Sequence, residues 1–363
     1  MSTVTETRES ATSPEAHPAP GASAASAVRA GRMRRRRRTT IITAVLALAL
    51  LLVFAVALMV GNTFYGPGEV VRVILGETVP GASFTVGELR LPRASLGVLT
   101  GLAFGIAGVT FQTMLHNPLA SPDIIGISTG ASAAAVIGVV VFSLDETPVS
   151  FLALGGALLT AGAIYLLAYR RGFSGARLIL IGIGVAAMLM SVVNYVLSRA
   201  SAWDLQTAMQ WLAGSLNGAT WDRVGPLAIA FLALGPVLLL EGRSLGVLRL
   251  GDATAAALGV RVNRSRLLLI LAAVALLAFA TAAAGPIAFV AFMAGPIAAR
   301  LVGPGASLLV PAALVGALLT LSADLLGQFA FDTRYPVGVI TGVLGAPYLV
   351  YLLIRTNRSG GSL

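Results

Sequence analysis

This chain of 363 residues contains no cysteine, no lysine and only two histidines, His17 and His116. The lack of cysteine excludes disulfides, thiol nucleophiles and cysteine-ligated metals. The lack of lysine excludes an ATP site of the kind that depends on a phosphate-loop lysine. The two histidines lie far apart in the sequence, so they do not predict a histidine metal cluster.

Charge is also scarce, and long apolar runs replace it. Hydrophobic residues make up 57% of the chain and charged residues 11%, and the mean hydropathy is +0.89. Because a bilayer core needs about 20 apolar residues per helical span, the composition predicts an all-α polytopic membrane protein. Ten spans are expected, at about residues 41–60, 93–115, 122–142, 149–169, 177–197, 224–241, 266–284, 286–302, 306–328 and 336–354.

The N-terminal region is polar and then strongly basic. Residues 1–40 hold eight arginines and three glutamates, so half of the net charge of +10 lies there. Residues 1–28 have no apolar period, and we expect 1–40 to be a disordered basic cytoplasmic tail. The run Arg34–Arg38 could indicate nucleic-acid binding, but a basic run before a span more simply holds that end in the cytoplasm. The apolar run behind it lacks a convincing cleavage site and predicts an uncleaved first span.

The loop arginines predict the orientation. With the N-terminus inside, the inner loops 170–176, 242–265 and 355–363 are rich in arginine, and the outer loop 143–149 carries only acidic charge. This pattern places both termini in the cytoplasm, with residues 356–363 as a short tail. The arginines that violate the pattern invite a functional explanation; they are Arg72, Arg90, Arg93, Arg199, Arg223 and Arg334.

Two loops are long enough to have structure of their own. Residues 198–223, outside, contain three tryptophans, which favour a membrane interface. Residues 242–265, inside, contain an Asp–Ala-rich–Gly pattern over 251–259 that suits a short capped helix. That helix is either a docking element for a soluble partner or a simple connector.

The spans contain almost no ionisable groups. Asp324 and Glu241 lie near span ends, and Asp324 is either a coupling carboxylate or, more simply, a residue that packs against helix ends. No catalytic arrangement or metal-ligand spacing is present. Since a proton-coupled pump normally carries ionisable groups in mid-membrane, the chain resembles a pathway that a separate ATPase drives.

One segment is especially informative. Arg90-Leu91-Pro92-Arg93 opens an apolar span in which Gly97, Gly101 and Gly105 recur every four residues. Such a glycine face lets helices approach closely. The span closes on Asn117-Pro118-Leu119-Ala120-Ser121-Pro122.

These motifs resemble the permease family of ABC importers for ferric siderophores, haem and cobalamin. The similarity continues through 211–215, 251–260, 285–290, Ala323-Asp324 and 336–339, and covers about residues 41–355 in order. The resemblance implies a type II importer permease with ten helices in the cytoplasmic (inner) membrane. It also implies a second permease subunit, which is either a second copy of this chain or, as the motifs favour, an unlike chain. Two ATP-binding subunits that hold ATP and Mg²⁺ and an extracytoplasmic siderophore-binding protein are implied as well. No cofactor of its own and no nucleic acid are expected.

The resemblance also assigns roles to residues. The outward arginines Arg90 and Arg93 would pair with glutamates of the binding protein, with contact to phosphate headgroups as the alternative. Gln328 stands where a third docking arginine is usual, and either Arg334 or the partner permease would supply that contact. Asn117 and Leu119, together with Ser174 and Gly175, would line the cytoplasmic gate. The ATPase would contact the segment 251–259 through Gly251, Asp252, Ala255, Leu258 and Gly259.

The sequence motif at residues 121–128 favours a ferric siderophore as substrate, and cobalamin or haem stays an alternative. Two other classes are weighed. The first is a secondary transporter, which would need no ATPase subunit. The second is a membrane scaffold or a membrane enzyme, and the sequence contains no catalytic constellation to support an enzyme.

Overall fold

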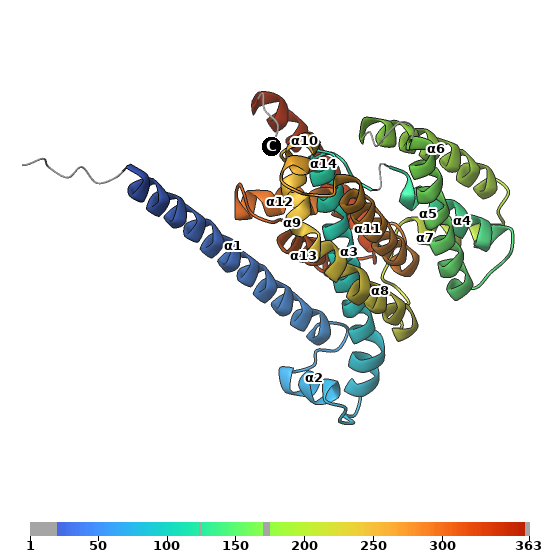
Figure 1. The fold of residues 1–363 in the computed structure, drawn as a ribbon. Helices are drawn as coiled ribbons and strands as arrows, with labels where there is room; N and C mark the ends of the chain where they lie inside the picture. The colour runs from blue at the N-terminus through green and yellow to red at the C-terminus, as the bar shows by residue number, and fades with distance from the viewer. Residues whose placement is uncertain (1–19, 123–124, 170–174, 360–363) are drawn as a thin grey trace, which may run out of the picture.

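The computed structural model describes residues 20–122, 125–169 and 175–359, and these are helical with no strand among them. Figure 1 shows a bundle from which one long helix projects. The elements, in chain order, are α1 (Pro20–Met59), α2 (Pro67–Ile74), the π-helical η1 (Ser83–Arg90), α3 (Leu91–Met114), α4 (Ile127–Val140), α5 (Glu146–Ala168), α6 (Gly175–Leu197), α7 (Ala202–Leu212), α8 (Trp221–Leu240), α9 (Gly242–Leu248), α10 (Asp252–Ala257), α11 (Val262–Ala284), α12 (Val290–Val302), α13 (Leu309–Phe329) and α14 (Val337–Ser359).

Each predicted span overlaps one of these helices. Eight helical stretches in the described residues are long and apolar enough to cross a membrane. The other two, α4 and α12, are apolar but shorter. The prediction of an all-α polytopic protein is confirmed, with ten as an approximate number of crossings.

The N-terminal tail is shorter than predicted. The expectation that residues up to 40 are disordered is wrong for 20–40, because α1 begins at Pro20 and continues without interruption into the first span. Alanine and arginine both favour helix, and proline is well accepted in the first turn. Residues 1–19 lie outside the described part of the chain. At the other end, α14 extends to Ser359.

The centre of the bundle is α3, which packs most extensively on α13 and also on α11, α12 and α8. Its glycines make these contacts possible. A Cβ at Gly101 would lie 2.5 Å from Cα of Ala317 on α13, and one at Gly105 would collide with the carbonyl of Ala312. Gly108 faces the backbone of Ala291 on α12 in the same way. The predicted glycine face is therefore a helix–helix contact.

An element that the sequence analysis missed precedes α3. Residues Ser83–Arg90 form the π-helical turn η1, which runs directly into α3. Arg90 ends the π-helical part and Arg93 lies in the first turn of the α-helix, where Pro92 is well tolerated. The two arginines thus lie where the helix changes its winding.

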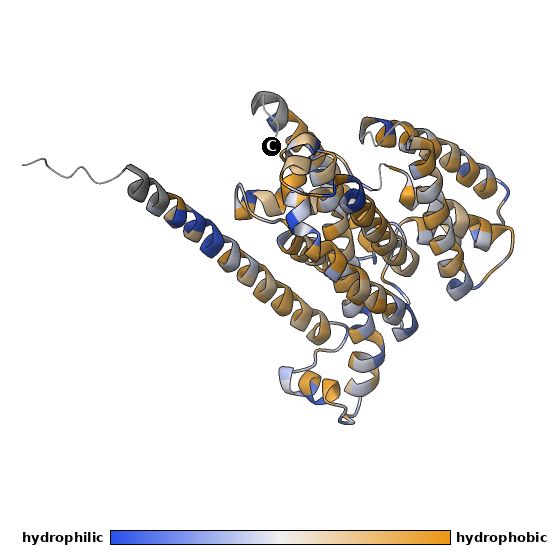
Figure 2. Ribbon diagram, in the orientation of Figure 1, coloured by the Kyte–Doolittle hydropathy of each residue, from blue (hydrophilic) through white to orange (hydrophobic). Residues whose placement is uncertain are grey.

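The bundle has two opposite ends, one at α2 and the other at α10. At the α2 end, residues 58–63 lie against Arg90, and Asn217 and Asp324 lie against Arg93. At the α10 end, His116 contacts Leu248 and Arg266 contacts Asp252. Figure 2 shows apolar helices between these ends and a hydrophilic stretch on the projecting part of α1.

Candidate docking, gate and coupling sites

Arg90 closes the end of α1. Its guanidinium donates to the carbonyls of Leu58 and Met59, both at 2.9 Å, and to that of Thr63 at 2.6 Å. It also lies over the ring of Tyr65, with 5.1 Å between Cζ and the ring centroid. The last carbonyls of a helix lack intrahelical donors, and a cation there also opposes the helix dipole. Arg90 therefore has a structural task within the chain.

Arg93 is held by a second set of partners. Its Nε donates to Oδ2 of Asp324 on α13 and its Nη2 donates to Oδ1 of the same carboxylate, both at 2.8 Å. Its Nη1 donates to Asn217 Oδ1 at 2.8 Å. Gln328 donates to the same carboxylate. The side chain of Asp324 is only 3% exposed. A bidentate pair of this kind is strong and directional, so Asp324 is held as the partner of Arg93.

Arg334 is the freest of the three predicted docking residues. It is exposed, and its hydrogen bond to Asn62 Oδ1 is long, at 3.4 Å. All three arginines line one cavity of about 300 Å³ at the α2 end, together with Asn62, Asp324 and Gln328. The structure thus brings the predicted docking residues together, and the role itself stays a prediction.

The remaining arginines that violated the orientation pattern also have partners within the chain. Arg72 pairs with Glu77 at 2.6 Å, and Arg199 lies over the ring of Tyr195. Arg223 of α8 pairs with Glu146, the first residue of α5. These arginines therefore all have partners within the folded chain, and the partners of Arg93 and Arg223 lie far away in the sequence.

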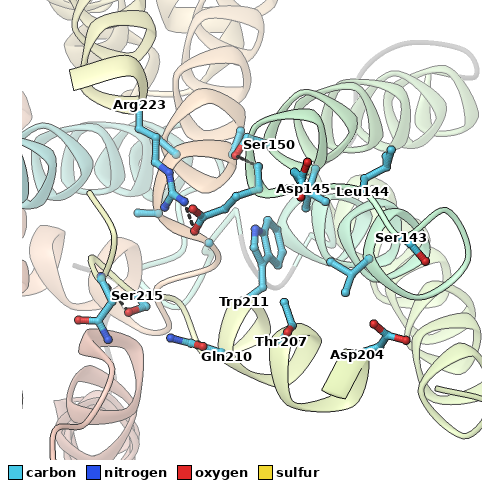
Figure 3. Close-up of a pocket in the computed structure, with 18 of the residues that line it drawn as sticks. Ser143, Leu144, Asp145, Ser150, Asp204, Thr207, Gln210, Trp211, Ser215 and Arg223 are labelled. Carbon is cyan, nitrogen blue, oxygen red and sulfur yellow. Dashed lines mark hydrogen bonds and ion pairs between the residues drawn. The ribbon is translucent and has the colours of Figure 1, made fainter. Parts of the chain in front are cut away.

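A second, larger cavity was not predicted. Its volume is about 370 Å³, and the ends of α4, α5, α7, α8 and α11 surround it. Figure 3 shows Trp211 among the lining residues, with Arg223 on one side of it and Asp145, Asp204 and Thr207 on the others. Asn217 lines this cavity and also binds Arg93, which lines the first one. The segment around Asn217 therefore separates the two cavities.

The predicted gate residues are only partly described. Asn117 accepts a hydrogen bond from the backbone N–H of Leu119 at 2.9 Å, an Asx turn that closes the loop after α3. Gly175 begins α6, and a Cβ there would lie 2.7 Å from Leu115 Cδ2. Gly175 and Asn117 thus approach the same end of α3, whereas Ser174 lies outside the described residues.

The predicted coupling segment forms the short helix α10. Gly251 precedes it with φ +94° and Gly259 follows it with φ +84°, conformations that favour glycine. Asp252 pairs with Arg266 of α11 at 2.7 Å, and Ala255 is buried. Leu258 is 63% exposed. The helix is confirmed, with one apolar side chain presented outward and one ion pair to the bundle.

These features define a multi-pass membrane permease, with clustered arginines at one end and a short glycine-bounded helix at the other. The chain belongs to the FecCD transport family, whose model matches residues 48–355. Among the described residues, no group of three or more His, Asp or Glu side chains could hold a metal ion.

Curated relatives agree with this family. The chain is 43% identical over 291 residues, 80% of its length, to the ferric enterobactin transport system permease protein FepG of Escherichia coli, covering 88% of that protein. It is 41% identical to the achromobactin transport system permease protein CbrC of Dickeya dadantii, over 86% of this chain and 91% of that protein. A cobalamin import system permease protein of Halobacterium salinarum is 37% identical over 75% of this chain and 74% of that protein.

A solved structure agrees as well. The fold matches an inward-facing metal-chelate type ABC transporter with a TM-score of 0.78 and 25% identity, over 87% of this chain and 99% of that chain. The chain therefore has the type II ABC importer permease fold and is of the class that assembles with other subunits.

Proposed function

We propose that this chain is a permease subunit of an ATP-driven importer of ferric siderophores. The observation that carries the substrate class is the 43% and 41% identity to permeases named for enterobactin and achromobactin transport. The nearly charge-free spans fit a wide, weakly binding pathway. ATP hydrolysis belongs to two separate subunits, and this chain is not an enzyme.

The α2 end is the outer face, where an extracytoplasmic binding protein docks through acidic side chains. The support is the single cavity that Arg90, Arg93 and Arg334 line. Of these, Arg334 is the best available cation, because Arg90 and Arg93 are already engaged within the chain. The α10 end faces the cytoplasm together with both termini, as the loop arginines predict. A second permease subunit, an unlike chain, completes the pathway in the cytoplasmic membrane.

Charge reversal tests the docking assignment. Arg334→Glu should weaken binding of the loaded binding protein at least tenfold, because an attractive rim charge becomes repulsive. The matched control is Arg199→Glu, which reverses another exposed arginine predicted to be outside. Binding would be measured with the reconstituted transporter, and folding checked by thermal unfolding. If the affinity is unchanged in both variants, Arg334 is not part of the docking site. The proposal that the chain is an importer permease would still stand.

The cobalamin relative keeps one alternative substrate open. Titration of the cognate binding protein with ferric catecholates, ferric hydroxamates, haem and cobalamin would distinguish them. Tight binding of cobalamin or haem alone would overturn the siderophore assignment. Uptake that persists without any ATPase subunit and collapses with an uncoupler would instead indicate a secondary transporter.

A further inference from the structure

The first helix is too long for a simple span. At 1.5 Å per residue, the 40 residues of α1 extend about 60 Å, twice the roughly 30 Å thickness of a hydrocarbon core. Figure 1 shows this helix projecting from the bundle, and Figure 2 shows its hydrophilic stretch next to an apolar one. About half of α1 must therefore lie beyond the hydrocarbon.

The depth of α1 follows from its anchored end. Leu58 is 2% exposed, and Arg90 binds the carbonyls of Leu58 and Met59. Counting back about 30 Å from Met59 reaches Thr39. A tilt of about 20° changes this by only one or two residues. The basic turn, which consists of Arg34–Arg38, directly precedes Thr39. At this depth it lies in the headgroup layer at the α10 end.

Two arginines of the basic turn are held by the protein. Arg38 Nη2 donates to the carbonyl of Leu301, near the end of α12, at 3.0 Å. Arg38 also lies beside Gly303, where a Cβ would be 3.2 Å from Nη1, and Arg35 lies beside Gly305 in the same loop. These contacts fix the rotation of α1 at this depth.

Two of the other three arginines face away from the bundle. Successive helical residues are about 100° apart, so Arg36 and Arg37 point elsewhere when Arg35 and Arg38 face the loop. Arg34, four positions before Arg38, lies on the same side of α1 as Arg38. All five side chains are exposed, and residues 20–59 contain no acidic residue to neutralise them. The apolar part of α1 is only 11% buried, so the rest of this chain leaves most of it uncovered.

We propose that the basic turn is a binding site for the headgroups of anionic phospholipids, held in place by Arg35 and Arg38 on the loop between α12 and α13. Guanidinium groups bind phosphate oxygens bidentately, and each arginine at such a surface strengthens association about fivefold. Orientation alone needs only net positive charge in the tail. The site additionally has a fixed depth and a fixed facing direction, which concentrate anionic lipid beside α1.

The test places a fluorophore next to the site. Because the chain has no cysteine, Ile41→Cys gives it a single labelling site, and the chain is labelled before its partner subunits are added. Ile41 is 50% exposed and lies one turn inside the basic turn. The transporter with its partner subunits is reconstituted with phosphatidylcholine. Phosphatidylglycerol or phosphatidylcholine with the same brominated chains is then added as a quencher. Brominated phosphatidylglycerol should quench more strongly than brominated phosphatidylcholine at equal content, and high salt should reduce the difference.

Variants then separate charge from position. Arg34→Gln/Arg36→Gln/Arg37→Gln should abolish the preference, and the same triple change to lysine should retain most of it. The matched pair is Arg36→Gln against Arg29→Gln. These residues are seven positions apart on one helix face, and Arg29 lies about 10 Å farther from the hydrocarbon, about one Debye length. Arg36→Gln should therefore reduce the preference more.

Three results would overturn the proposal. One is equal quenching by the two lipids in the parent protein, and another is a preference that survives the triple glutamine change. The third is a preference seen in the isolated permease and lost in the complete transporter, which would show that an acidic partner subunit covers the basic turn instead.

Discussion

Arg93 and Asp324 are 231 positions apart in the chain, and their side chains meet through two hydrogen bonds of 2.8 Å. This pair joins the first turn of α3 to α13 at the predicted outer face. It gives Arg93 an intrachain partner at the place where docking to a partner protein is proposed. A docking carboxylate would therefore meet a guanidinium whose Nε and Nη2 are already in use.

The pair should contribute measurably to stability. Asp324→Asn leaves the partly buried Arg93 without its anion, so we expect a loss of about 1–3 kcal/mol in the free energy of unfolding. In a double-mutant cycle with Arg93→Gln, the two losses should not add. Thermal unfolding of the purified protein measures both. The exposed pair Arg72–Glu77 is the control, with a coupling energy near zero expected. Additive losses at Arg93 and Asp324 would show that the pair contributes nothing.

At the scale of elements, α3 can pack closely on its neighbours because its glycines have no side chain. Gly101 and Gly105 contact backbone atoms of α13, and Gly108 contacts backbone atoms of α12. Because backbone cannot move aside as a flexible side chain can, even one methyl group must separate the helices. These contacts fix α3 against α13 and α12, and with it the positions of Arg93 near its start and of Asn117 just after its end.

Gly105→Ala should therefore destabilise the protein by about 1–3 kcal/mol, through overpacking against Ala312. The control is Gly162→Ala in α5, where no atom lies within 4 Å of the added Cβ. There, alanine should be neutral or stabilise by up to about 1 kcal/mol, because it favours helix. Thermal unfolding in detergent compares the two variants. Equal effects at both positions would contradict the close packing of α3 on α13.

For the whole molecule, the arrangement separates two tasks. Clustered arginines lie at the α2 end, and α10 lies at the opposite end between Gly251 and Gly259. The chain contains no phosphate-loop lysine. Energy from partner subunits would have to enter through the α10 end.

Leu258→Asp tests this separation. Its side chain is 63% exposed, so the change should leave the thermal unfolding temperature nearly unchanged. It should strongly reduce co-purification of the ATPase subunits and ATP-driven uptake, because a charge would replace an apolar side chain at the proposed interface. Leu240→Asp is the control, at another exposed leucine near the end of α8. Full uptake by Leu258→Asp would reject α10 as the coupling element.

The sequence by itself determined the class of the protein through the resemblance of its motifs to one family. The places of the apolar helices, the glycine face and the helix at 251–259 follow from local composition and period, since apolar length and glycine spacing act within one helix. It misjudged residues 20–40 because a polar composition does not forbid a helix that continues an adjacent span.

Only the tertiary structure decided which partners the arginines have. Arg93 with Asp324, Arg223 with Glu146 and Arg38 with the carbonyl of Leu301 each join distant parts of the chain. No local pattern predicts such pairs, because they depend on which helix ends the packing of the whole bundle brings together. The π-helical turn η1 and the cavity around Trp211 depend on that packing for the same reason.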